Sequence, residues 1–302
     1  MDVYLPIAGM SVNALVIILL GAGVGFLSGM LGVGGGFLTT PLLIFYGVPP
    51  AVAVASSATQ ITGASVSGAL AHARRKGVDF KMGAVMVVGG LIGSVAGSFL
   101  FELLQALGQI DTAIQVVYVL MLLSIGGLML RDSIRALWPR KNGPRRPPPR
   151  RHNPFVAALP WRMRFYRSGL YISPLAPLLL GFAVGILTVI MGIGGGFIIV
   201  PAMIYLLGMA ASVVVGTSLF QIIFVTAATT LLHATQSKTV DIVLAGLLLV
   251  GGVVGAQYGA FAARKLPAEK LRLGLAIVVL GFGIRLALQL TYRPGEIFSV
   301  TA

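Results

Sequence analysis

Residues 32–37 read Gly-Val-Gly-Gly-Gly-Phe, and Pro41 follows them. Residues 192–197 read Gly-Ile-Gly-Gly-Gly-Phe, and Pro201 follows at the same spacing. In both places a helix-length apolar stretch precedes the motif, and only a short apolar stretch comes after it. One glycine-rich run would carry little information, but two at matching places in two halves of a chain indicate an internal repeat.

The composition is that of a protein that lies in the lipid bilayer. Of the 302 residues, 57% are hydrophobic and 10% are charged, whereas an ordinary soluble domain has about 25% charged residues. Segments such as 12–31 and 112–130 are long enough to cross a hydrocarbon core, which takes about 20 apolar residues. The sequence therefore predicts an all-α integral membrane protein. No cleaved signal peptide is expected, because no positively charged region precedes the first apolar run.

The net charge of +14 is concentrated in one stretch of the chain. Half of the 22 lysines and arginines lie in residues 131–171, a segment rich in proline and arginine that cannot build a core. We interpret it as a cytoplasmic linker beside anionic lipid, and we expect no nucleic-acid partner. The predicted organisation is a first transmembrane repeat at 1–130, this linker, and a second repeat at 172–302.

Each repeat is predicted to contain about five helical segments. They are residues 12–31, 36–46, 51–72, 81–103 and 112–130, and then 172–191, 196–207, 212–233, 241–263 and 271–290. In the first repeat, Lys and Arg gather between the third and fourth segments; in the second, they gather between the fourth and fifth. By the positive-inside rule, equivalent loops then lie on opposite faces of the membrane. The repeats are therefore predicted to be inverted, with both termini outside.

The segments 36–46 and 196–207 are too short to span a bilayer, which favours broken, half-length helices at the glycine motifs. A helix that starts inside the protein presents unpaired N–H groups and the positive end of its dipole, a combination that binds anions. Gly34, Gly35, Gly36, Gly194, Gly195 and Gly196 are therefore candidate substrate-binding residues. The alternative is that these glycines, like Gly21, Gly25, Gly89, Gly93 and Gly97, only permit close helix packing.

Polar side chains recur at a matched place in the third segment of each repeat. Hydroxyl and amide groups can hold an oxyanion without burying a fixed positive charge. The alternative is that they form hydrogen bonds between helices. The candidates are Ser56, Ser57 and Gln60 in the first repeat and Thr217, Ser218 and Gln221 in the second.

Other titratable residues have simpler interpretations. Asp79 and Asp241 precede apolar runs and are predicted to be helix N-caps. His72 and His233 end their segments, where we expect hydrogen bonds near the membrane boundary; the alternative is a role in proton coupling. With no cysteine and three histidines, no cofactor and no metal site is expected. The apolar segments contain no pair of carboxylates that could serve as a catalytic acid and base, so we do not expect an enzyme.

Taken together, these motifs resemble those of the TauE/SafE family of sulfite and organosulfur-anion exporters, also called the 4-toluene sulfonate uptake permease family. The resemblance rests on the paired glycine motifs, on the Ser-Ser-x-x-Gln and Thr-Ser-x-x-Gln echoes, and on Arg-Lys-Gly-x-Asp at residues 75–79. It implies a carrier in the bacterial inner membrane that exports sulfite, sulfoacetate or a related sulfonate. An anion channel, or an uptake permease for another small anion, is the alternative.

Overall fold

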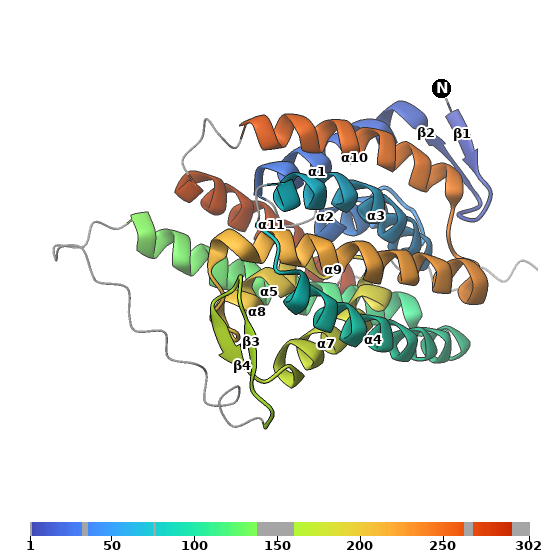
Figure 1. Cartoon of the computed structure of the whole chain (residues 1–302). Helices are drawn as coiled ribbons and strands as arrows, with labels where there is room; N and C mark the ends of the chain where they lie inside the picture. The colour runs from blue at the N-terminus through green and yellow to red at the C-terminus, as the bar shows by residue number, and fades with distance from the viewer. Residues whose placement is uncertain (1, 32–35, 75–76, 138–159, 263–267, 292–302) are drawn as a thin grey trace, which may run out of the picture.

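The computed structural model describes residues 2–31, 36–74, 77–137, 160–262 and 268–291 (Figure 1). These residues form helices and two short β-hairpins, so the fold is the predicted all-α membrane fold. The helices of the first half are α1 (Ala14–Leu31), α2 (Gly36–Phe45), α3 (Pro50–Arg74), α4 (Phe80–Ala106) and α5 (Ile110–Leu137). Those of the second half are α7 (Leu175–Met191), α8 (Gly196–Tyr205), α9 (Ala211–Leu232), the π-helical turn η1 (His233–Ser237), α10 (Ile242–Ala262) and α11 (Ala268–Thr291).

Among the described helices, five stretches are long and apolar enough to cross a membrane: Phe80–Ala106, Ile110–Arg135, Val213–Ser237, Ile242–Gly259 and Leu273–Thr291. By contrast, α2 and α8 have 10 residues each. At 1.5 Å per residue they are about 15 Å long, roughly half of the hydrocarbon thickness. The chain is therefore a multi-pass membrane protein in which both glycine motifs introduce half-length helices.

Two β-hairpins were not predicted from the sequence. Strands β1 (Asp2–Leu5) and β2 (Met10–Asn13) pair in front of α1, while β3 (Met163–Phe165) and β4 (Leu170–Ile172) pair in front of α7. Both turns contain a glycine with a left-handed backbone, Gly9 at φ 66° and Gly169 at φ 64°. The second hairpin lies inside the segment that we interpreted as linker, and α5 also continues into that segment.

Helices of one sequence half pack against helices of the other. Figure 1 shows α1 beside α10 at one edge of the molecule and α4 beside α7 at another. Glycines line both contacts: a Cβ on Gly25 would lie 2.2 Å from the Gly252 carbonyl oxygen, and one on Gly185 would lie 2.2 Å from the Gly90 carbonyl oxygen. Only glycine permits backbones to approach so closely. The close-packing interpretation is thus confirmed for Gly21, Gly25, Gly89, Gly93 and Gly97, whose added Cβ atoms would all meet backbone atoms of a neighbouring helix.

Candidate substrate site at the two glycine motifs

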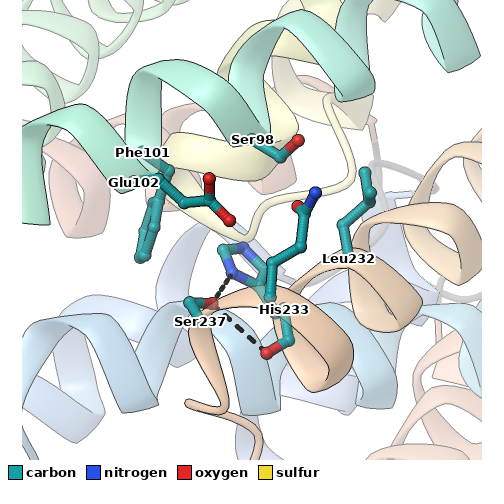
Figure 2. Close-up of a pocket in the computed structure, with 7 residues that line it drawn as sticks. Ser98, Phe101, Glu102, Leu232, His233 and Ser237 are labelled. Atoms are coloured by element: carbon teal, nitrogen blue, oxygen red, sulfur yellow. Dashed lines mark hydrogen bonds between the residues drawn. The ribbon is translucent and has the colours of Figure 1, made fainter.

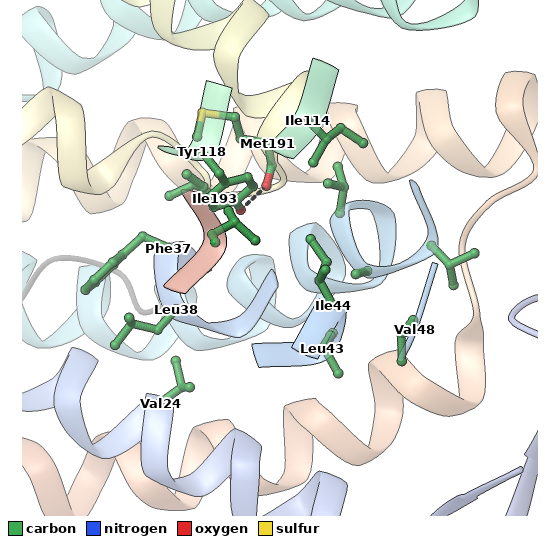
Figure 3. Packing of buried hydrophobic residues seen from close by; sticks show 14 of the residues in the cluster. Val24, Phe37, Leu38, Leu43, Ile44, Val48, Ile114, Tyr118, Met191 and Ile193 are labelled. Carbon is green, nitrogen blue, oxygen red and sulfur yellow. Dashed lines mark hydrogen bonds between the residues drawn. The ribbon is translucent and has the colours of Figure 1, made fainter. Parts of the chain in front are cut away.

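The two glycine motifs bring the starts of α2 and α8 together. Phe37 and Phe197, the residues that follow the last glycine of each motif, stack with ring centroids 4.3 Å apart and an interplanar angle of 13°. A Cβ on Gly36 would lie 3.1 Å from the Ile193 carbonyl oxygen, so the backbones are also close. The stack joins a cluster of buried apolar side chains from both halves, among them Leu38, Tyr118 and Met191 (Figure 3).

The second motif forms the turn between α7 and α8. Gly192 caps α7 at φ 67°, Gly194 follows at φ 67°, and Gly195 is the N-cap of α8 at φ 71°. Residues with a side chain rarely adopt this left-handed region. A Cβ on Gly195 would in addition lie 2.0 Å from Cγ1 of Val184. Glycine is therefore required at the second motif by both conformation and space.

In the first motif, Gly36 begins α2 and is buried, and a Cβ there would lie 1.9 Å from Cδ1 of Ile61. Gly34 and Gly35 lie outside the described residues. The part of the first motif that the structure describes is therefore as tightly packed as the second.

The broken end of α7 is capped by side chains from three other helices. Nε2 of His233 on the α9 end lies 3.0 Å from the Val189 carbonyl oxygen, to which it donates. The Met191 carbonyl oxygen accepts hydrogen bonds from Oγ1 of Thr40 at 3.4 Å and from the hydroxyl of Tyr118 (Figure 3). The last carbonyls of a helix have no partner within it, and a break inside a membrane protein must satisfy them from elsewhere. Sequence reasoning missed Thr40 and Tyr118 in this role.

Two of the predicted site hydroxyls bond to the loop before a helix of the other half. Ser56 Oγ accepts a hydrogen bond from the Asp241 backbone N–H at 3.2 Å. Thr217 Oγ1 accepts one from the Asp79 backbone N–H at 2.9 Å and donates to the Val213 carbonyl at 2.7 Å. Ser218 donates to the Val215 carbonyl at 2.9 Å. The described contacts of these hydroxyls are thus with backbone groups and not with the glycine turns.

The two glutamines enter the glycine crossings of the neighbouring helices. Gln60 Nε2 lies 2.5 Å from where a Cβ on Gly252 would be, and Gln221 Nε2 lies 3.2 Å from where one on Gly90 would be. Both side chains are buried, with exposed fractions of 4% and 1%. The glutamines therefore lie at equivalent crossings, one between α3 and α10 and one between α9 and α4.

Several buried polar atoms on α2, α3 and α9 lack a hydrogen-bond partner among the described residues. They are Oε1 of Gln60 and Gln221, Oγ of Ser57 and Ser65, and Oγ1 of Thr39 and Thr229. An unpaired buried polar group costs about 1–3 kcal/mol, so each calls for an explanation such as a ligand or water. Three of them, on Ser57, Gln60 and Gln221, belong to the residues singled out in the sequence.

Residues next to the glutamines, which sequence reasoning passed over, make direct contact with the second turn. A Cβ on Gly194 would lie 2.9 Å from Cγ2 of Ile61, 2.9 Å from Cγ2 of Thr226 and 3.0 Å from Cγ2 of Ile222. Successive residues of a helix point about 100° apart, which explains why Ile61 and Ile222 face the turn while the glutamines before them do not. Thr226 lay in an apolar run and carried no distinguishing signal.

Asp79 and Asp241 are N-caps, as predicted, and each also holds a hairpin of the other half. Asp79 Oδ1 accepts from the Met82 N–H at 3.1 Å, while its Oδ2 accepts from the Ser168 N–H at 3.0 Å and from the Ser168 hydroxyl. Asp241 accepts from the N–H groups of Val243 and Leu244 at 3.1 Å each, and from that of Ile7 at 3.0 Å. Ser168 and Ile7 lie in the turns of β3–β4 and β1–β2, so the two clamps correspond.

A small recess lies where α4 meets η1, beside His233 (Figure 2). His233 Nδ1 lies 3.1 Å from Ser237 Oγ, and its ring makes an edge contact with Phe101 at a centroid distance of 4.6 Å. The other lining residues are Ser98, Glu102, Leu232 and Gln236. Within the described residues there is no group of three or more His, Cys, Asp or Glu that could hold a metal ion.

Comparisons with known proteins identify the family of the chain. The family model described as "Sulfite exporter TauE/SafE" matches residues 17–286. The "Probable membrane transporter protein YjnA" of Bacillus subtilis is 29% identical over 273 residues, which cover 89% of this chain and 98% of that protein. A "Probable membrane transporter protein" of Xylella fastidiosa is 31% identical over 264 residues, covering 86% and 89%. No solved structure matches. Since the family model spans most of the chain, this protein belongs to the TauE/SafE sulfite exporter family of membrane transporters.

Proposed function

We propose that this membrane transporter is a secondary carrier that exports a small sulfur oxyanion, such as sulfite or an organosulfonate resembling sulfoacetate, across the bacterial inner membrane. The observation that carries the proposal is the contact between the two half-helices, whose first aromatic residues stack at 4.3 Å. Because of this contact, the starts of α2 and α8 can act on one ligand. The family description supplies the sulfur oxyanion as substrate class.

The chemistry of the centre suits an oxyanion. A helix start offers backbone N–H groups and a positive dipole end, and glycine lets a ligand approach them without interference from a Cβ. The proposed binding residues are Gly34–Gly36 and Gly194–Gly196, with Ser57, Gln60 and Gln221 as neutral partners. Ser57 Oγ has no partner among the described residues and could donate to an oxyanion, and the glutamines would donate through Nε2. Ser56 and Thr217 would support this set by tying α3 and α9 to the starts of α10 and α4, and Ser218 by its hydrogen bond within α9.

Transport would follow alternating access around a central site that two inverted repeats build. The inverted sense of the repeats rests on the charge of the loops. The repeat relation itself is supported by the exchange of partners, because α1 packs on α10 just as α7 packs on α4. It is also supported by the matching clamps of Asp79 and Asp241. From the charge of the loops, both termini would lie outside and the linker inside.

The moving bodies would not be the two sequence halves. Since Asp241 is bonded to Ile7 and Ser56, α10 belongs mechanically with β1–β2, α1 and α3; we call this group the α3 body. Since Asp79 is bonded to Ser168 and Thr217, α4 belongs with β3–β4, α7 and α9, the α9 body. The two bodies would move against each other where α3 meets α9.

Disulfides test this division, because the natural chain has no cysteine. The pair Gly63→Cys/Leu249→Cys lies inside the α3 body: Leu249 Cγ is 3.5 Å from where a Cβ on Gly63 would be. The pair Gly68→Cys/Leu219→Cys joins the two bodies: Leu219 Cγ is 3.9 Å from where a Cβ on Gly68 would be. Both pairs link the two sequence halves, and in both the leucine side chain contacts the place of the glycine's added Cβ. We expect only the second disulfide to stop transport. If both disulfides stopped transport, the two sequence halves would be the moving units and the division proposed here would be wrong.

The substrate is tested by efflux from proteoliposomes loaded with sulfite, sulfoacetate, sulfate or thiosulfate. Export of an anion from a negative interior is favourable by about 2.3 kcal/mol per charge per 100 mV, so no coupled ion is required. We expect saturable, trans-stimulated flux of sulfite or a sulfonate, whereas a channel would show neither property strongly. Gln60→Ala/Gln221→Ala should lose this flux, and the exposed pair Gln105→Ala/Gln289→Ala should keep it. Absence of flux for every sulfur anion in folded protein would refute the substrate class.

A further inference from the structure

The contact between α3 and α9 carries a row of hydroxyl groups that the glycine-motif site does not include. Thr62 Oγ1 and Thr226 Oγ1 lie 2.8 Å apart, and Thr59 Oγ1 and Thr230 Oγ1 lie 3.3 Å apart. Ser65 and Thr229, on the same two helices within one turn of these pairs, have buried oxygens with no partner among the described residues. We call the four paired threonines the threonine seam.

The threonine seam reaches the second glycine turn. Thr226 Cγ2 lies 2.9 Å from where a Cβ on Gly194 would be, so the Thr62–Thr226 pair is next to the turn. Thr59 and Thr230 lie farther along the two helices, at the end where α3 begins and α9 ends. The seam therefore runs from the glycine turn toward one end of the α3–α9 contact.

The seam hydroxyls can donate their protons to a ligand without leaving a buried carbonyl oxygen unpaired. Thr226 donates to the Ile222 carbonyl at 2.7 Å within its own helix. The single hydroxyl proton of Thr62 can go either to Thr226 Oγ1 at 2.8 Å or to the Ala58 carbonyl at 2.9 Å. Such carbonyls already accept the backbone N–H of the residue four positions on. Each threonine proton is therefore available to an oxyanion.

The other end of the contact is apolar. A buried cluster of Ile61, Ala69, Leu219 and Ile222 begins at the glycine turn, which Ile61 and Ile222 touch. It extends away from the seam to Leu219, whose Cδ1 lies 3.0 Å from where a Cβ on Gly68 would be. The α3–α9 contact thus changes along its length from hydroxyl-lined to closed by aliphatic side chains.

We propose that the threonine seam lines the passage by which the anion reaches the glycine motifs, and that the apolar cluster closes the passage beyond them. The anionic nature of the ligand rests on the proposed function, whereas the position of the passage rests on the α3–α9 contact. Separation of the α3 body from the α9 body would open the closed end.

Thiol labelling tests the passage without knowledge of the substrate. In the cysteine-free chain, Thr62→Cys and Thr226→Cys should react with the anionic reagent 2-sulfonatoethyl methanethiosulfonate, and more slowly with its cationic trimethylammonium analogue. Leu120→Cys, on a 63% exposed position of the spanning helix α5, is the lipid-facing control and should not react, because thiolate does not form in hydrocarbon. Thr235→Cys on the exposed part of η1 calibrates the intrinsic rates of the two reagents.

Labelling of neither seam thiol above the Leu120→Cys background, in protein that elutes as a folded species, would overturn the passage. Thr59→Cys and Thr230→Cys repeat the test if a first variant fails to fold. Faster reaction of the seam thiols with the cationic reagent would refute the proposal that the passage favours anions.

Flux measurements separate this inference from the proposed function. Thr62→Val/Thr226→Val should lower sulfite or sulfonate efflux about tenfold, while Thr291→Val, on the exposed end of α11, should leave it unchanged. Labelled seam thiols in a protein without any sulfur-anion flux would refute the substrate class and keep the passage. Normal wild-type flux with unreactive seam thiols would refute the passage and keep the substrate class.

Discussion

The contact between α1 and α10 should respond very differently to two alanine substitutions on the same helix. A Cβ on Gly25 would lie 2.2 Å from the Gly252 carbonyl oxygen and 2.8 Å from its Cα, whereas one on Gly23 would meet no atom within 4 Å. An ordinary van der Waals contact begins at 3.4 Å, so Gly25→Ala requires the two backbones to separate locally by about 1.2 Å. Overpacking of this kind costs about 1–3 kcal/mol.

The matched variant Gly23→Ala removes the effect of helix propensity from the comparison. Both substitutions gain up to about 1 kcal/mol from replacing a helical glycine, so the difference between them isolates the clash. We expect Gly25→Ala to be about 1–3 kcal/mol less stable than Gly23→Ala, which should lower its thermal midpoint by several degrees. The assay is the fraction of monodisperse protein in detergent after heating to a series of temperatures. Equal midpoints would refute the close approach of α1 and α10.

Three further substitutions test the hydrogen bonds that hold the fold around the site. Asp241→Ala removes the acceptor of three backbone N–H groups and should destabilise the protein by about 2 kcal/mol in the same heating assay, whereas Asp111→Ala in the exposed first turn of α5 should cost less than about 1 kcal/mol. Tyr118→Phe deprives the buried Met191 carbonyl of one donor and should cost about 1–3 kcal/mol; an unchanged thermal midpoint would show that this bond does not stabilise the break. His233→Gln can still donate to the Val189 carbonyl, so it should retain more stability than His233→Ala, and the reverse order would contradict the capping role.

The sequence predicted the helices well because each depends on information within its own segment. The glycine motifs predicted where α1 and α7 end and where α2 and α8 begin, because the backbone conformation of glycine is a local property. The aspartate caps were predictable for the same reason, because Asp79 and Asp241 bond to N–H groups of the helix that follows.

The remaining features depend on partners far away in the chain. The turns of the hairpins are held by Asp79 and Asp241 of the other half, and their strands of three or four residues are too short to show a clear alternation. Likewise, Ser56 and Thr217 have the hydroxyls that an anion site needs, but the same hydroxyls also suit a loop backbone. A hydroxyl in the sequence is therefore compatible with either anion binding or a hydrogen bond to a loop. Its contacts in the folded protein are needed to see which groups it meets.

The pairing of α1 with α10 also affects how the protein is assembled during synthesis. The ribosome completes α1 long before α10, and domains made mainly of such distant contacts fold slowly. Until α10 arrives, the glycine face of α1, including Gly21 and Gly25, lacks the helix that it packs against in the folded protein. Asp241 likewise reaches the first hairpin only at this late stage. The nascent first half is therefore an incomplete intermediate that waits in the bilayer for the last helices, and it is the stage at which misassembly and degradation would act.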